Sequence, residues 1–226
     1  MDKNGVIGVY EFAAVIAPGA VTIFGLSRIY PGIGLLLKDN AISFGEFGLL
    51  LILAYATGHL VQPLGHVIEW AWWKLWRGYP TDWPRSDHHP LLAAQQAAIL
   101  PAKIRAVLQI DCPNTLSTID ERAWSSITRQ LYAAVKKAGQ VDRIDTFNAR
   151  YALFRGLAGG FSVIAATAIY ECPSTTFLIC VGFTLALAPT LSRMHRFGYH
   201  YARELFVQFL TIDATNSGTP EKEPSK

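Results

Sequence analysis

Four long stretches of this chain contain no charged residue. They cover residues 12–27, 47–68, 156–170 and 173–192. A helix needs roughly 17–25 apolar residues to cross a hydrocarbon core of about 30 Å, because unpaired backbone groups cannot face lipid. The second and fourth stretches have this length by themselves. The first and third reach it with the apolar residues beside them, so we predict four membrane spans.

The composition agrees with a small membrane protein. Only 16% of the 226 residues are charged, against about 25% in soluble domains, and 51% are hydrophobic. This balance disfavours an ordinary soluble domain, a disordered chain and a disulfide-stapled secreted module. The three cysteines have neither CxxC spacing nor neighbouring histidines. We therefore expect unpaired thiols, no metal site and no cofactor.

The distribution of Lys and Arg predicts the orientation of the spans. Residues 74–155 carry 12 Lys/Arg and 7 Asp/Glu, and the segment from Arg193 onward adds five basic residues. The loop between spans one and two has only Arg28 and Lys38, and the loop between spans three and four has neither type. Because basic residues accumulate on the cytoplasmic side, both termini and the middle segment should be cytoplasmic.

We therefore expect an all-α integral membrane protein with four transmembrane helices and a helical cytoplasmic domain inserted between spans two and three. The expected parts are residues 6–46 (first span and an outer or re-entrant segment), 47–73 (second span), 74–155 (basic helical domain), 156–192 (spans three and four), 193–212 (amphipathic cytoplasmic helix) and 213–226 (disordered tail). Thr118 with Glu121 resembles a capping box ahead of a 124–138 helix. A 141–155 helix should run directly into span three.

The second span carries a stripe of polar side chains. Tyr55, His59, Gln62, His66 and Glu69 recur at steps of four and three residues, which places them on one face of a helix. Such groups are costly at membrane depth and usually face a bundle interior or a water-filled cavity. The stripe could line a pore between several copies, join helices within the chain, or form a metal or proton-relay site. In a pore, Glu69 near the cytoplasmic mouth would favour cations.

No catalytic motif accompanies this stripe. The chain has no P-loop, GxSxG, HExxH or paired-carboxylate pattern. Asp87-His88-His89 lacks the further aspartates that a two-metal phosphoesterase needs, and a helix cap explains it more simply. We therefore do not expect an enzyme.

Basic and aromatic residues alternate in the middle segment. The candidates for ligand contact are Arg122, Trp124, Arg129, Arg150 and Arg155. Arginines beside aromatic rings can hold a nucleotide or oligonucleotide through phosphate contacts and base stacking. The same positive charge can instead keep the segment cytoplasmic and contact anionic headgroups. The residue types permit both interpretations.

Three short motifs resemble those of a known family. They are Pro18-Gly19 in the first span, residues 58–62 (GHLVQ) followed by Gly65 and Glu69 in the second, and residues 147–151 (FNARY) with 154–156 (FRG) entering the third. Together they resemble the Hailong-type membrane channel effectors of bacterial anti-phage defence operons, which act with a nucleotidyltransferase-like protein. The resemblance covers spans one to three, roughly half of the chain.

The resemblance implies an oligomeric ion channel, tetrameric or similar, in the bacterial inner membrane. A nucleic-acid-like signal would gate it or hold it closed, and its opening would depolarise the infected cell. A protein of another class also fits the residues, namely a non-conducting membrane anchor or adaptor whose cytoplasmic helices dock a soluble partner. A small transporter is a third possibility. It would have to dimerise, because the chain has only four spans and its sequence shows no inverted repeat.

Overall fold

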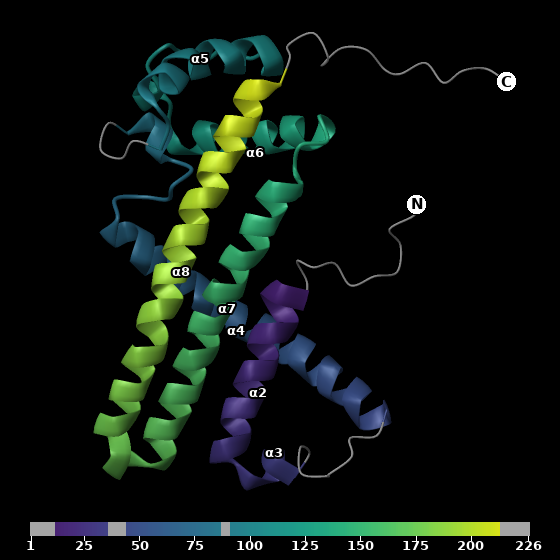
Figure 1. Ribbon diagram of the computed structural model, residues 1–226. Helices are drawn as coiled ribbons and strands as arrows, with labels where there is room; N and C mark the ends of the chain where they lie inside the picture. The colour runs from purple at the N-terminus through teal and green to yellow at the C-terminus, as the bar shows by residue number, and fades with distance from the viewer. Residues whose placement is uncertain (1–11, 36–43, 87–90, 213–226) are drawn as a thin grey trace, which may run out of the picture. The chain divides into compact units, whose positions relative to one another are not determined.

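A computed structural model of the chain describes residues 12–35, 44–86 and 91–212, and every regular element in these ranges is a helix, as predicted (Figure 1). The elements are η1 (Phe12–Ile16, a π-helix), α2 (Ala17–Ile29), α3 (Pro31–Leu35), α4 (Phe44–Leu75), η2 (Trp83–Arg85), α5 (Ala94–Leu108), η3 (Leu116–Thr118), α6 (Glu121–Lys137), α7 (Asp142–Glu171), η4 (Pro173–Thr175) and α8 (Thr176–Thr211). The expected disordered tail and the histidines of the Asp-His-His segment lie outside the described residues.

The chain forms two compact units. The first contains Met1–Arg77 and Asp145–Gly198, and the second contains Gly78–Ile144 and Tyr199–Lys226. Helix α7 starts in the second unit and continues into the first, whereas α8 starts in the first and ends in the second. The expected continuity between the 141–155 helix and span three is therefore confirmed, since both belong to α7.

Among the described residues, three helical segments are long and apolar enough to cross a membrane: Phe44–Leu75, Asp142–Glu171 and Pro173–Thr211. They contain the second, third and fourth predicted spans. The first predicted span forms a shorter apolar helix, Ala14–Ile29. At 1.5 Å per residue such a helix is shorter than the hydrocarbon core by itself. Three candidate spans are thus defined, and the fourth stays a prediction.

Small residues let the helices of the first unit approach closely. A Cβ atom on Gly19 would collide with the backbone of α4 at Ala54, and one on Gly58 would collide with the carbonyl of Val15. Helix α2 therefore approaches α4 closely at Pro18-Gly19. Because lipid supplies no hydrophobic force between helices, contact between small residues is the usual basis of their packing in membranes.

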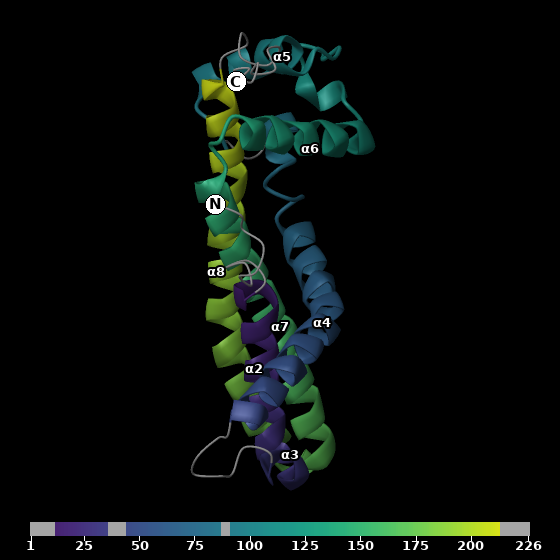
Figure 2. The same cartoon turned by 90° about the vertical axis from the view of Figure 1, so that its right-hand side faces the viewer.

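The same contacts define the directions of the helices. Helix α4 runs antiparallel to α2, because Gly19 faces Ala54 whereas Gly58, further along α4, faces Val15. Helix α7 runs parallel to α2, beside which it lies in Figures 1 and 2. Three successive contacts fix this pairing: Pro18 with Gly156, Thr22 with Gly160, and Ile164 with Gly25. The first part of α8 runs antiparallel to α7, to which the short η4 turn joins it (Figure 1).

The second unit has an apolar core of its own. On α6, three apolar side chains that recur at intervals of four are buried: Ile127, Leu131 and Val135. Trp124 precedes them on the same face and stacks on Phe206 of α8, with 6.0 Å between the ring centroids. This strongly amphipathic helix leaves its basic face exposed.

The start of α6 differs from the capping box that the sequence predicted. Asp120 is the N-cap, and its carboxylate accepts hydrogen bonds from the backbone N–H groups of Arg122 (2.8 Å) and Ala123 (3.0 Å). Thr118 instead donates its hydroxyl to the carbonyl of Thr115, the residue before η3. The predicted box was wrong because a nearer acidic side chain satisfies the free N–H groups of the first turn.

Replacing this N-cap should destabilise the second unit measurably. We expect Asp120→Ala to lower the free energy of unfolding by about 1 kcal/mol, because two N–H groups lose their acceptor, and Asp120→Asn to retain most of it. Thermal denaturation of the full chain in mild detergent measures both. Thr118→Ala is the control, and an equal loss in that variant would show that the cap lies elsewhere.

Candidate functional site

The predicted polar stripe on α4 divides into two groups. Tyr55, His59 and His66 are exposed, with 47% of Tyr55 and 57% of the His66 side chain accessible. Gln62 is half-buried, and only 6% of Glu69 is accessible. Three members of the stripe therefore face away from the rest of the chain, and two face into it.

The outward group forms a polar face on an apolar helix. The rings of Tyr55 and His59 meet edge to face, with 4.6 Å between their centroids. Pro63 lies within the helix and has no N–H, so the carbonyl of His59 lacks its usual helical donor. At membrane depth these groups need a polar neighbour or water, since lipid offers neither.

The inward group centres on Glu69, at a junction of α4, α7 and α8. The Tyr151 hydroxyl donates to Glu69 Oε1, and Arg155 Nη1 lies 3.3 Å from Oε2. His66 Nδ1 lies 3.1 Å from the same Oε2. Trp73 Nε1 in turn donates to the Tyr151 hydroxyl at 2.7 Å. The buried carboxylate therefore has a cationic partner and a hydroxyl donor on α7.

Arg155 extends this network toward the start of the chain. Its Nη2 donates to Gln62 Oε1 at 3.4 Å, and Gln62 Nε2 donates to the carbonyl of Ala14 in η1. The guanidinium carbon also lies 5.9 Å from the centroid of the Tyr151 ring. The Arg155 Nε is buried and has no hydrogen-bond partner among the described residues. The contacts of the Arg155 guanidinium described above are thus all with residues of the first unit.

Helix α8 contributes His195 to the junction. Its ring stacks on Trp73, with 4.9 Å between centroids, and lies 4.5 Å from the centroid of Trp76. Trp72 Nε1 donates to His195 Nδ1 at 3.3 Å. Close by, Gly198 approaches Trp73 so tightly that a Cβ would meet its ring. His195 is a residue that sequence reasoning missed, because nothing in its spacing links it to the tryptophans of α4.

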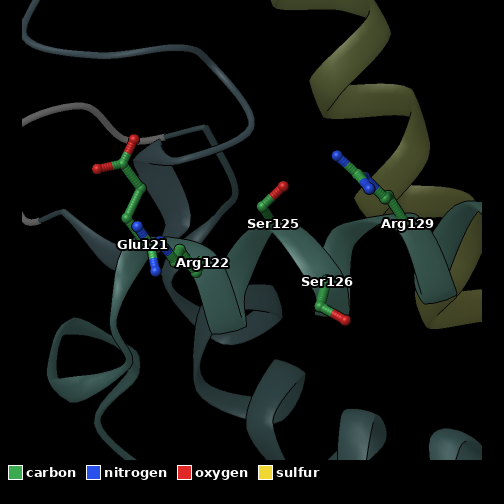
Figure 3. Close-up of a pocket in the computed structure, with 5 residues that line it drawn as sticks. All are labelled: Glu121, Arg122, Ser125, Ser126 and Arg129. Carbon is green, nitrogen blue, oxygen red and sulfur yellow. The ribbon is translucent and has the colours of Figure 1, made fainter.

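Two of the predicted ligand residues lie together on the exposed face of α6. Arg122 and Arg129 line a surface cavity of about 460 Å³ that also has a carboxylate and two hydroxyl groups on its wall, from Glu121, Ser125 and Ser126. Figure 3 shows Ser125 and Arg129 extending from the same side of the helix, with Arg122 beside Glu121. Two guanidinium groups and hydroxyl donors are suited to an anionic ligand.

Trp124 lies on the opposite face of α6 from this cavity. Its side chain is fully buried, and Nε1 donates to the carbonyl of Thr81 at 2.8 Å. The structure therefore brings Arg122 and Arg129 together but places the Trp124 ring in the core. Arg150 and Arg155 belong to the first unit, where the Arg150 guanidinium lies 5.6 Å from the centroid of Phe197.

Two titratable groups of the second unit are perturbed by burial. Burial raises the pKa of the Asp82 carboxyl, although the nearby Arg85 opposes the effect. Burial also raises the pKa of the Cys112 thiol, so this group is not a reactive thiolate at neutral pH. Over the described ranges, no cluster of three His, Cys, Asp or Glu side chains is placed to hold a metal ion.

No family model, curated protein or solved structure matches this chain.

Proposed function

We propose that the chain is one subunit of a homo-oligomeric ion channel in which α4 lines the pore. The observation that carries this proposal is the exposed polar face of Tyr55, His59 and His66 on a helix that is long and apolar enough to span a bilayer. Several copies around an axis would turn these faces toward a shared aqueous lumen. Gln62 and Glu69, the other predicted lining residues, contact other parts of the same chain in this structure.

The proposed channel has four spans and a cytoplasmic insert. The alternating helix directions support this topology, because α2 and α7 run one way and α4 and the first part of α8 run the other. The Lys/Arg distribution supports placing both termini and the basic segment in the cytoplasm. The chain would then be a multi-pass protein of the bacterial inner membrane.

The proposed role is that of an effector in anti-phage defence. This part rests on the motif resemblance, which also suggests a nucleotidyltransferase-like partner and a short nucleic-acid signal. The basic cavity on α6 supports a ligand with phosphate groups, because two arginines and two serine hydroxyls surround it. Binding there would gate the channel, and the resulting ion flow would depolarise the infected cell.

A second candidate function is a non-conducting membrane anchor that docks a soluble partner. The contacts of Gln62 and Glu69 within the chain favour it, since they show that part of the stripe joins helices. An anchor needs no lumen, so Tyr55, His59 and His66 would contact neighbouring helices.

Ion flux separates the two candidates. We expect purified protein in KCl-loaded liposomes to release K⁺, and short single-stranded oligonucleotides to change the rate. His59→Ala should alter the flux several fold, because it removes one ring per subunit from the proposed lumen. Measurements with and without oligonucleotide test the pore and its ligand together.

Thr184→Ala is the matched control for this experiment. Thr184 is also an exposed polar residue of a candidate span, on α8, but its hydroxyl bonds to the Cys180 carbonyl of its own helix. Its flux should equal that of the unchanged protein. Folded protein that releases no K⁺ under any condition would contradict the channel and favour the anchor.

A further inference from the structure

We propose that Glu69, Tyr151 and Arg155 form a charge latch that holds α4 against α7 and keeps the channel closed. The inference rests on the proposed function and adds its regulation. In the paired state the carboxylate is buried and turned toward α7. Opening would require this contact between the two helices to break.

The latch is a buried ion pair with a hydroxyl donor. Only 7% of the Glu69 side chain and 14% of the Arg155 side chain are accessible. Burial makes each charge dependent on the other, because an ion left alone in such a site is strongly destabilising. The Tyr151 hydroxyl donates to the same carboxylate and is itself fixed by Trp73. Glu69 therefore has a strong preference for the paired arrangement.

The contact between α4 and α7 beside the pair is tight. A Cβ on Gly65 would collide with the carbonyl of Arg155, and one on Gly159 would collide with the carbonyl of Val61. The backbones of α4 and α7 thus touch at two successive levels beside the ion pair, both on the side toward the start of α4. Closely packed interfaces change between discrete states and do not deform gradually.

Helix α7 connects the latch to the proposed ligand-binding part of the chain. Tyr151 and Arg155 lie in the same uninterrupted helix as Asp142, which belongs to the second unit. A ligand that displaced the start of α7 would therefore act directly on the partners of Glu69. Release would also free one carboxylate per subunit beside His66, on the face that we propose lines the pore. A ring of such carboxylates favours cations.

A double-mutant cycle tests the latch. Glu69→Gln leaves Arg155 without its counter-charge, and Arg155→Gln leaves the buried Glu69 without its guanidinium partner. Each single variant should conduct in the absence of oligonucleotide, at a rate well above that of the unchanged protein. The Glu69→Gln/Arg155→Gln variant has neither charge, so it should return most of the way to the closed state. Arg193→Gln, the same change at an exposed arginine, should behave like the unchanged protein.

A distance measurement tests the same prediction without ion flow. Spin labels at Leu60→Cys on α4 and Ala166→Cys on α7 occupy exposed positions, in a background that lacks the three native cysteines. Labelled protein is diluted with unlabelled protein so that distances within one chain dominate. We expect one narrow distribution of label-to-label distances in the unchanged protein and a shifted or broadened distribution in each single variant. In the double variant the narrow distribution should return.

The outcomes separate the latch from the channel. If the single variants stay closed, or if the double variant conducts as the product of the two single effects, the two residues act independently and the latch is wrong. A different result would be that no variant conducts, while the spin-label distances change in each single variant and return in the double variant. The contact is then a two-state latch, and the channel proposal fails. If the distances do not change while the protein stays folded, the pair is not a moving element.

Discussion

Replacing Gly58 with leucine should prevent the first unit from packing. A Cβ at this position already collides with the carbonyl of Val15, so a full side chain forces α4 away from η1. Overpacking of this kind typically costs about 1–3 kcal/mol, and we expect the upper end because the colliding atoms belong to the backbone. Since 1 kcal/mol shifts the midpoint by roughly 2–4 °C at this chain length, thermal denaturation in mild detergent should detect it clearly.

The same helix supplies the control. Gly48 also lies in α4, but a Cβ there meets nothing within 4 Å. Gly48→Leu should therefore leave the midpoint unchanged or raise it, because leucine has the higher helix propensity. Equal losses in the two variants would mean that leucine perturbs α4 itself and that the contact with η1 is unimportant.

The contrast between Gly48 and Gly58 also shows how much of the fold the sequence predicts. Charge-free length alone locates the three long apolar segments, because the bilayer thickness fixes the number of residues that a span needs. It does not decide the first span, whose apolar helix Ala14–Ile29 is shorter. Nor does it show which glycines touch a neighbour, since Gly48 and Gly58 look alike in the sequence.

The sequence predicted which residues of α4 form the candidate site, but not which residues of the other helices they contact. The spacing of the stripe identifies one face of α4, yet Glu69 turns toward α7 while His66 remains exposed. The sequence grouped Arg155 with ligand-binding arginines, whereas in the structure it pairs with Glu69. One signal points to this pairing. Glu69 and Arg155 are each the charge nearest to the charge-free stretch of their own helix. Because an isolated charge is costly at membrane depth, the two are expected to lie together.

Trp124→Ala should produce the largest loss in the second unit, and it separates a core role from a ligand role. The indole is fully buried, stacks on Phe206 and donates to the carbonyl of Thr81. Truncating such a side chain typically costs about 3–5 kcal/mol, through lost burial and the cavity left behind. Thermal denaturation of the full chain should show this, whereas Ile99→Ala on the exposed part of α5 should cost little.

Oligonucleotide binding by folded variants completes the comparison. Trp124→Phe keeps an aromatic ring in the core, so it should bind like the unchanged protein once folded. Arg122→Gln and Arg129→Gln remove charge from the cavity wall and should weaken binding without lowering the unfolding midpoint. If Trp124→Phe instead loses affinity while Arg122→Gln and Arg129→Gln retain theirs, the ligand contacts the indole. The core of this unit would then have to open for binding, which the burial of Trp124 makes costly.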